Sequence, residues 1–419
     1  MIRDGLAAFK GRRILLLQGP LGPFFKRIAA DLTRAGAQVT KVDFNGGDWL
    51  FSARGAIAFR GAAADWPEFF EQLLDEHTID MVLLFGDCRP LHRVAHEIAC
   101  RRALEIGVFE EGYVRPDYVT MERFGVNGHS RISRNPNCYL DAPKIDIAPP
   151  IEVGNTFWHA AWWAFLYYQA SVLLWPVFRH YQHHRPLTLW EIVPWLRGTW
   201  RKHYFARKEK GMQERLASTL AGQYFLVPLQ VHNDAQLRVH SEFDTVFDFI
   251  HMVMVSFAEC APDDVHLVIK QHPMDRGYHD YSPLIAELAC LHGVADRVLY
   301  LHDQHLPTLL EHARGVVLVN STVGLSALFH GTPLMVCGAA IYDMQGLSYQ
   351  GALDDFWTAA RDHPVDHELF LRFRNYLIEH TQLNGSFYRR LAIEGSDAGL
   401  VWAAAEASQR SSMNAAGAS

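Results

Sequence analysis

The chain has 419 residues, a length that predicts about two or three domains. Hydrophobic residues make up 49% and charged residues 20%, a globular composition that excludes collagen, coiled coil and wholesale disorder. The formal net charge of −7 argues against a nucleic-acid-binding protein, because such domains are basic. The 6 cysteines lie far apart without a CxxC motif, and the N-terminus lacks the apolar segment of a signal peptide. These features predict a protein of the reducing cytosol without a disulfide framework or a zinc ribbon.

Strands and helices alternate over the first part of the chain. Short apolar runs that predict buried strands lie at residues 14–17, 39–44, 80–85 and 106–109. Apolar residues at helical spacing lie between these runs, and this alternation predicts a parallel sheet covered on both faces. Ligands of such sheets bind at the carboxyl ends of the strands. We therefore predict a Rossmann-like domain over residues 1–150, with its site at the strand ends.

The same alternation returns in the second half of the chain. Its apolar runs lie at residues 224–227, 266–270, 298–301, 315–319 and 334–336. They predict a second Rossmann-like domain over residues 216–365, followed by helices at 366–410 and a disordered tail at 411–419. The predicted fold class is α/β, with two doubly wound domains facing a cleft and a helical insertion at residues 151–215.

The insertion at residues 151–215 is rich in aromatic and basic residues. Seven of the 11 tryptophans lie between residues 158 and 200, and residues 157–178 contain no Asp, Glu, Lys or Arg. Nine Lys or Arg against three Glu follow at residues 179–215. Aromatic residues beside a basic stretch are typical of a membrane interface with anionic headgroups; a buried helical hairpin and a true span are the alternatives. The residues predicted to lie at this interface are Trp158, Trp162, Trp163, Arg201 and Lys202.

Two adjacent carboxylates, Glu110 and Glu111, follow the apolar run at residues 106–109 and precede Gly112. In a doubly wound domain this strand end lies at the ligand site. Proximity of two carboxylates raises the pKa of one of them, which suits a general base or a nucleophile. Ordinary surface glutamates are the alternative. Further residues assigned to the same cleft are Gly19, Gly22 and Arg115.

Polar motifs also follow three predicted strands of the second domain. Their residues are Gln230, then Lys270, Gln271, His272 and Pro273, and then Asn320, Ser321 and Thr322. A histidine at a strand end can donate to a phosphate, and hydroxyls at a helix N-terminus bind phosphate without a metal. A bare helix cap and an ordinary loop are the alternatives. The chain contains no Asp-x-Asp, no HExxH and no His/Cys cluster in sequence, so we predict no metal site.

As a set, these motifs resemble the capsule polysaccharide biosynthesis proteins of the KpsS/LipB type. The matching segments are residues 109–118, 228–241, 271–273 and 320–331. The resemblance implies a metal-independent GT-B glycosyltransferase without a cofactor, which transfers the first Kdo from CMP-β-Kdo to lyso-phosphatidylglycerol with retention of configuration. It also implies a peripheral location on the inner face of the cytoplasmic membrane, with a KpsC-type transferase and a capsule ABC exporter as partners.

The resemblance also assigns roles to residues. One of Glu110 and Glu111 attacks the anomeric carbon, and we favour Glu111. His272 contacts the CMP phosphate or assists its departure. The resemblance assigns Ser321 and Thr322 to the same phosphate. From their position after predicted strands, we add Gln230, Lys270, Gln271, Pro273 and Asn320 to the donor-binding residues. Our own inference is that Lys270 neutralises the Kdo carboxylate or the phosphate.

Other functions fit the same motifs. A transferase for a different CMP-sugar, such as a sialic acid, shares the donor chemistry. A non-catalytic capsule export or scaffold protein would need no carboxylate in its cleft. A nucleotide-sugar-binding module without turnover is a third possibility.

Overall fold

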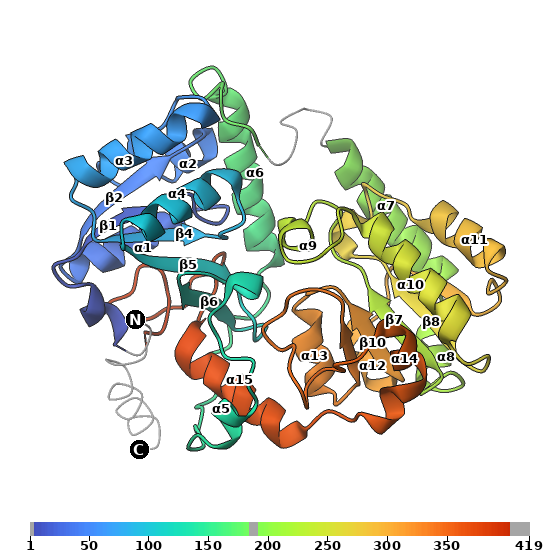
Figure 1. Cartoon of the computed structure of the whole chain (residues 1–419). Helices are drawn as coiled ribbons and strands as arrows, with labels where there is room; N and C mark the ends of the chain where they lie inside the picture. The colour runs from blue at the N-terminus through green and yellow to red at the C-terminus, as the bar shows by residue number, and fades with distance from the viewer. Residues whose placement is uncertain (1–3, 184–191, 403–419) are drawn as a thin grey trace, which may run out of the picture. The chain divides into compact units, whose positions relative to one another are not determined.

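The computed structural model describes residues 4–183 and 192–402. The chain forms two compact units, each built on its own β-sheet (Figure 1). The first unit comprises Met1–Arg131, Ile145–Thr188 and Arg374–Ser419, and the second comprises Ile132–Lys144 and Leu189–Phe373. The predicted α/β class with two parallel-sheet domains is confirmed.

The sheet of the first unit has the order β12-β6-β5-β4-β1-β2-β3. Its strands are β1 (Arg13–Leu16), β2 (Gln38–Asp43), β3 (Ile57–Ala58), β4 (Met81–Phe85), β5 (Glu105–Glu111), β6 (Tyr118–Arg123) and β12 (Gln382–Asn384). The strands from β5 to β3 are parallel, whereas β6 is antiparallel to β5 and β12 is antiparallel to β6. The carboxyl ends of β4 and β5 therefore lie side by side, with Phe85 paired to Phe109 and Glu110 following.

Both faces of this sheet are buried. Along β1, Ile14 and Leu16 belong to one hydrophobic cluster and Leu15 to another, as the alternation of side chains along a strand requires. Helix α1 (Phe24–Arg34) packs into the first cluster, and α3 (Trp66–Glu76) and α4 (Pro90–Arg101) pack into the second. The apolar runs found in the sequence are thus strands with two covered faces.

The C-terminal part differs from the prediction of helices over residues 366–410. Helix α15 (His367–Thr381) is present, but β12 follows at once, with Leu383 opposite Val119 of β6. The helical prediction is therefore wrong for residues 382–402, because pairing with a distant strand fixes β12 and no helix follows it there; residues 403–410 lie outside the described residues. The tail predicted at residues 411–419 lies outside the described residues.

The second unit contains a parallel sheet with the order β11-β10-β7-β8-β9. Its strands are β7 (Tyr224–Pro228), β8 (His266–Lys270), β9 (Val298–Leu301), β10 (Gly315–Leu318) and β11 (Leu334–Val336). Its helices include α5 (Asn137–Leu140), α8 (Met212–Ala217), α9 (Ala235–Val239), α10 (Val246–Cys260), α11 (Ser282–Leu291), α12 (Leu306–His312), α13 (Val323–Phe329) and α14 (Leu353–Ala359). All five strands lie where the sequence predicts them, and Gln230, Lys270 and Asn320 stand at or just beyond their carboxyl ends.

Residues 151–215 contain helices that belong to different units. Helix α6 (Phe157–Leu173) lies in the first unit, and α7 (Ile192–Lys208) lies in the second. Within residues 4–183 and 192–402, no helix combines the length and the apolar character needed to cross a bilayer. Helix α6 packs against α2 (Gly46–Leu50), where a Cβ at Gly46 would lie only 2.2 Å from the Ala170 carbonyl oxygen. Glycine therefore permits this close approach.

Candidate active site

Glu110 is half-buried at the end of β5, beside the loop that joins β4 to α4. Its Oε1 accepts a hydrogen bond from the main-chain N–H of Glu111 at 2.9 Å. Burial raises the pKa of Glu110 to about 7; the negative charges of Glu111 and Asp87 add to this effect, while the Glu111 N–H and Arg89 oppose it. Near neutral pH this carboxyl group can hold or release a proton, as a general acid or base must.

Glu111 has a different environment from Glu110. Its Oε1 accepts a hydrogen bond from the Tyr388 hydroxyl at 3.0 Å. Burial and the neighbouring Glu111 carboxylate raise the pKa of Tyr388 above its usual range, so the hydroxyl stays protonated and serves as a donor. Tyr388 follows β12, and the sequence analysis did not find it because that segment was predicted to be helical.

The turn between β5 and β6 holds the main chain of Glu110 and Glu111, the acidic pair, in place. A Cβ at Gly112 would lie 2.1 Å from the Tyr118 carbonyl oxygen, so only glycine fits. The Thr120 hydroxyl donates to the Glu111 carbonyl oxygen at 3.0 Å. Arg115, predicted to lie in the cleft, is exposed, and its Nε donates to the Gly112 carbonyl oxygen at 3.2 Å.

A buried polar cluster that the sequence analysis missed lies at the carboxyl end of β1. Gln18 donates from Nε2 to Asp48 Oδ2 at 2.9 Å and to the Tyr167 hydroxyl oxygen at 3.1 Å. The Tyr167 hydroxyl, on α6, donates to Asp48 Oδ1 at 2.8 Å and accepts from Asn45 Nδ2 at 2.8 Å. The Oε1 of Gln18 accepts from Arg89 Nη1 at 2.8 Å. This cluster connects α6 to the residues beside Glu110.

The two glycines predicted to form the cleft, Gly19 and Gly22, are buried and serve packing. A Cβ at Gly19 would lie 2.6 Å from Cγ of Phe25. Gly22 has φ of +108° and lies against Trp163, whose Cβ would be 2.9 Å from an added Cβ. Their close packing explains why both positions require glycine.

The residues predicted to lie at a membrane interface have different environments. Trp158 is 75% exposed and Trp162 is 55% exposed, and Lys202 on α7 is exposed as well. Trp163 points inward, and its indole N–H donates to the Tyr388 carbonyl oxygen at 3.0 Å.

For Arg201 the structure requires a correction. The side chain is buried, forms an ion pair with Asp280, and donates to the Arg276 carbonyl oxygen at 3.1 Å. Its charge is neutralised inside the second unit and is not presented to headgroups. Sequence alone does not distinguish Arg201 from its exposed neighbour Lys202.

In the second unit, the predicted donor residues after β8 are held in place. Lys270 is buried, and its desolvation lowers its pKa, while Asp303 acts in the opposite direction. Nδ1 of His272 accepts the Met274 N–H at 3.2 Å, so the proton of the neutral ring lies on Nε2. Gln271 donates to the His279 carbonyl oxygen at 2.8 Å. Pro273 is exposed and begins the short 3₁₀ turn Pro273–Asp275.

The residues after β7 and β10 contact one another. Gln230 donates from Nε2 to Asn320 Oδ1 at 3.0 Å, and Asn320 donates to the Gln236 carbonyl oxygen at 3.1 Å. Within the described residues, the buried Oε1 atoms of Gln230 and Gln271 have no hydrogen-bond partner. Buried acceptors without a partner are uncommon and require an explanation.

Ser321 and Thr322 precede α13. The Ser321 hydroxyl accepts the Val323 N–H at 3.3 Å, whereas the Thr322 side chain forms no capping hydrogen bond.

A histidine–carboxylate pair near these residues was not found from the sequence. Nδ1 of His232 lies 2.5 Å from Oδ1 of the fully buried Asp275, and the His232 N–H donates to Oδ2 at 2.7 Å. Two bonds to one carboxylate fix the orientation of the imidazole ring. The histidine itself was visible in the loop after β7, but only the fold brings Asp275 to it.

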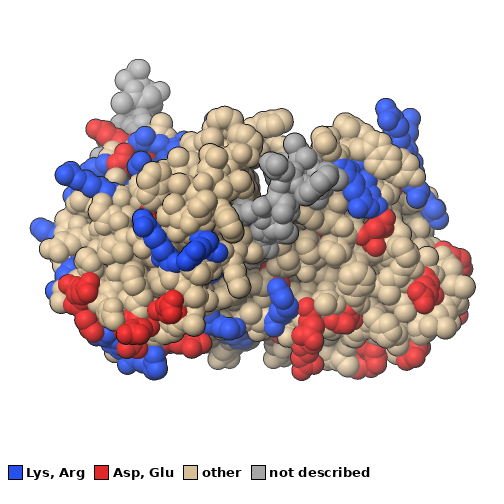
Figure 2. Space-filling model, turned by 90° about the horizontal axis from the view of Figure 1, so that it is seen from above, with Lys and Arg blue, Asp and Glu red and all other residues tan. Residues whose placement is uncertain are grey.

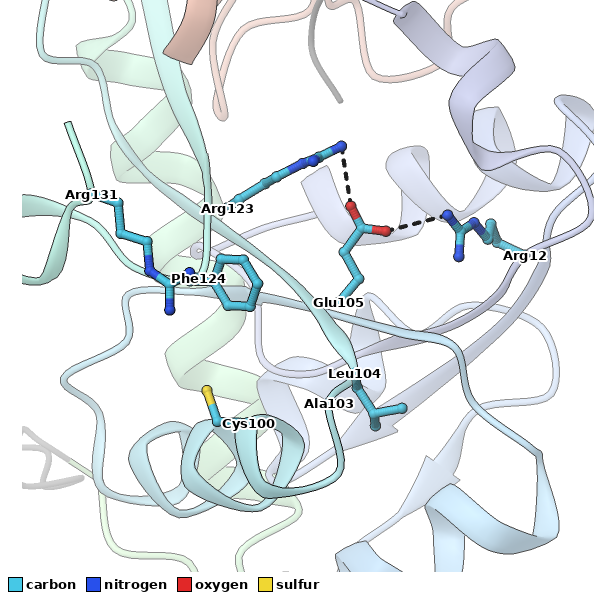
Figure 3. A pocket seen from close by; sticks show the side chains of 8 residues that line it. All are labelled: Arg12, Cys100, Ala103, Leu104, Glu105, Arg123, Phe124 and Arg131. Atoms are coloured by element: carbon cyan, nitrogen blue, oxygen red, sulfur yellow. Dashed lines mark ion pairs between the residues drawn. The ribbon is translucent and has the colours of Figure 1, made fainter. Parts of the chain in front are cut away.

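A surface cavity of about 600 Å³ lies elsewhere on the first unit (Figure 3). It is at the amino end of β5, the opposite end of that strand from Glu110. Glu105 lies between Arg12 at 3.4 Å and Arg123 at 3.3 Å, and the Arg131 guanidinium lies 3.9 Å from the centre of the Phe124 ring. The cavity is therefore separate from the acidic pair.

Comparison with known proteins identifies the family. Residues 80–388 match the family described as capsule polysaccharide biosynthesis protein. The chain belongs to this family. The matched residues begin with the strand before Arg89, include Glu110, Glu111 and His272, and end at Tyr388.

Individual proteins with similar sequences also have capsule polysaccharide functions in their names. The chain is 41% identical over 385 residues to the capsule polysaccharide export protein KpsS of Escherichia coli, covering 90% of this chain and 97% of that protein. It is 38% identical over 387 residues to the capsule polysaccharide modification protein LipB of Neisseria meningitidis, covering 90% and 92%. A solved structure of Thermosulfurimonas dismutans KpsC, titled beta Kdo 2,7 transferase, is 15% identical, covers 96% of this chain and 99% of its own, and gives a TM-score of 0.45. The resemblance inferred from the motifs is confirmed.

Proposed function

We propose that this member of the capsule polysaccharide biosynthesis family is a retaining β-Kdo glycosyltransferase that transfers Kdo from CMP-Kdo to lyso-phosphatidylglycerol. The observation that carries the proposal is the acidic pair at the end of β5, where two adjacent carboxylates have unlike environments. Pairs of titratable groups in unlike environments are typical of acid–base and nucleophile assignments in catalysis. Family membership supplies the capsule context.

In this proposal Glu111 is the nucleophile and Glu110 handles the proton. The carboxylate of Glu111, oriented by Tyr388, attacks the anomeric carbon as the bond from that carbon to the CMP phosphate breaks. The acceptor hydroxyl then displaces Glu111 and gives its proton to Glu110, whose pKa of about 7 suits a base at neutral pH. Two displacements at one carbon restore the original configuration.

The donor is proposed to bind the second unit. The proton on Nε2 of His272 can donate to a phosphate oxygen, and Lys270 supplies positive charge. The unpartnered Oε1 atoms of Gln230 and Gln271 are acceptors suited to donors on a nucleotide or sugar. Asn320, Ser321 and Thr322 complete the assigned donor residues. No metal or cofactor is part of the proposal.

The outer face of α6 is proposed to lie at the surface of an anionic membrane. Trp158, Trp162 and Phe165 follow one another at helical spacing and are 75%, 55% and 53% exposed. Trp49 of the adjoining α2 is 55% exposed. Much of the surface drawn in Figure 2 carries no Lys, Arg, Asp or Glu. Exposed aromatic side chains are typical of helices that lie in the interfacial plane. A lipid acceptor would give this contact a purpose, and a KpsC-type transferase and a capsule exporter are the proposed partners.

The test is a turnover assay with CMP-Kdo generated in situ and fluorescent lyso-phosphatidylglycerol, with the product identified by mass. We expect one added Kdo, abolished in Glu111→Gln and strongly reduced in His272→Ala. Glu105→Gln, the same change at the other end of β5, is the matched control and should retain activity. Transfer from a CMP-sialic acid but not from CMP-Kdo would favour the other CMP-sugar function. A folded protein that neither forms product nor releases CMP would favour the scaffold function.

A further inference from the structure

We infer that Arg89 binds an anionic oxygen group of a substrate, a carboxylate or a phosphate, next to Glu110. The inference rests on the proposed function and deepens it. Arg89 stands immediately before α4, at the carboxyl end of β4, and its side chain is half-buried.

The guanidinium group of Arg89 is held in place by neutral groups. Nη1 donates to Gln18 Oε1 at 2.8 Å and to the Gly19 carbonyl oxygen at 3.3 Å. The guanidinium carbon lies 4.9 Å from the centre of the Phe85 ring. Contacts from the ends of β1 and β4 therefore fix a group that would otherwise have considerable rotamer freedom.

The charge of Arg89 is not neutralised within the part of the chain that the structure describes. No carboxylate of those residues lies within 4.0 Å of its guanidinium, whereas Arg276, which is also half-buried, pairs with Asp303 at 2.8 Å. Asp48 is separated from Arg89 by the Gln18 amide, which donates to Asp48 and accepts from Arg89. This arrangement orients the guanidinium without pairing it to a carboxylate.

Gly86 leaves room between Arg89 and Glu110. A Cβ at Gly86 would lie 3.6 Å from Glu110 Oε2 and 3.9 Å from Arg89 Nε, and, apart from the flanking residues Phe85 and Asp87, no other group of the described residues comes within 4 Å of that point. The φ of Gly86 is +68°, a conformation that disfavours a side chain. Arg89 and Glu110 thus flank one position without forming an ion pair. A substrate oxygen can accept from Arg89 there and, while Glu110 is protonated, from its carboxyl group as well.

The chemistry of arginine identifies the ligand class. Guanidinium groups match the geometry of carboxylate and phosphate oxygens and form strong charge-assisted hydrogen bonds with them. The proposed reaction offers both: the carboxylate of the acidic sugar and the phosphate of the lipid acceptor. The inference is that one of these binds Arg89 beside Glu110.

The experiment compares wild type with Arg89→Gln and Arg89→Lys. Arg93→Gln removes an exposed arginine from the next turn of α4 and is the matched control. Thermal unfolding of each variant checks that it folds. We expect Arg89→Gln to raise the KM of one substrate by about ten-fold or more, the ratio that corresponds to 1.4 kcal/mol, with a smaller rise in Arg89→Lys and none in Arg93→Gln. A raised KM for CMP-Kdo places an anionic group of the donor at Arg89, and this group is the sugar carboxylate if the binding of free Kdo is lost as well. A raised KM for the lipid identifies its phosphate.

A binding measurement separates this inference from the proposed function. Titration of the proteins with free Kdo and with glycerol phosphate, followed by NMR of the ligand, requires no turnover. Binding lost in Arg89→Gln but kept in Arg93→Gln supports the anion site even if no transfer is found. Equal binding by both variants, or unchanged KM values in an active Arg89→Gln enzyme, overturns it.

Discussion

Replacing Tyr167 with phenylalanine tests whether the buried cluster at the end of β1 holds α6 in place. The hydroxyl donates to Asp48 and accepts from Asn45 and Gln18, all within 3.1 Å. Tyr167 is only 4% exposed, so water cannot replace these bonds without rearrangement. The substitution removes a bond to a carboxylate and leaves Asn45 short of an acceptor.

The magnitude follows from these contacts. A hydrogen bond to a charged group contributes about 1.5–3 kcal/mol, and a buried donor left unsatisfied costs about 1–3 kcal/mol. Because the bonds share one cluster and are not additive, we expect a loss of about 2–4 kcal/mol in the free energy of unfolding. The Gln18 amide loses one of its neighbours as well, so the kcat/KM of the transfer should also fall.

The assay is chemical denaturation of Tyr167→Phe, with Tyr204→Phe as the control. Tyr204 lies on α7 and is 45% exposed, so its hydroxyl should contribute less than about 0.5 kcal/mol. A loss in Tyr167→Phe as small as that of the control would show that these hydrogen bonds contribute little to stability. It would mean that the apolar packing of α6, and not the polar cluster, holds the helix.

Three further outcomes are expected. Because burial raises the pKa of Glu110 to about 7, the folded state retains a proton there that the unfolded chain has lost. Denaturation curves should therefore show wild type losing stability relative to Glu110→Gln as the pH rises from about 5 to 8. An equal pH dependence of the two proteins would contradict this. Trp158→Ser combined with Trp162→Ser should weaken sedimentation with anionic vesicles several-fold. Leu291→Ser, at an equally exposed apolar site on α11, should not weaken it. Equal losses of vesicle binding in the two proteins would argue against a specific membrane-binding surface on α6. Arg201→Gln should lower the free energy of unfolding by about 1–3 kcal/mol without changing vesicle binding. Weaker vesicle binding by an Arg201→Gln variant of unchanged stability would mean that Arg201 contacts the membrane after all.

The parallel strands were predictable because each is a short apolar run whose neighbours are helices. Strands β6 and β12 were not, because neither is a continuous apolar run: β6 carries Thr120, Glu122 and Arg123, and β12 has three residues. β12 depends on pairing with a segment more than 250 residues earlier in the chain. The residues around β12 in the sequence do not predict that pairing.

The acidic pair was found because both carboxylates lie in one local motif at a strand end. Tyr388, which donates to Glu111, and Arg89, which lies near Glu110, come from other segments, and only the fold brings them to the acidic pair. Contacts between distant segments, which the sequence does not show, also explain why Arg201 was wrongly assigned to the membrane interface. A basic stretch in sequence gives the sign of the charges, but the fold decides which of them reach solvent, as the pairing of Arg201 with Asp280 of another loop shows.

The most direct test of the central claim is to trap the sugar on the enzyme. The protein would be mixed with CMP-Kdo in the absence of acceptor, quenched in acid, digested and analysed by peptide mass. We expect a peptide heavier by one Kdo residue, with the modification on Glu111, absent from Glu111→Gln and retained in Glu105→Gln. An enzyme that transfers Kdo but carries the sugar on another residue, or an active Glu111→Gln variant, would contradict it.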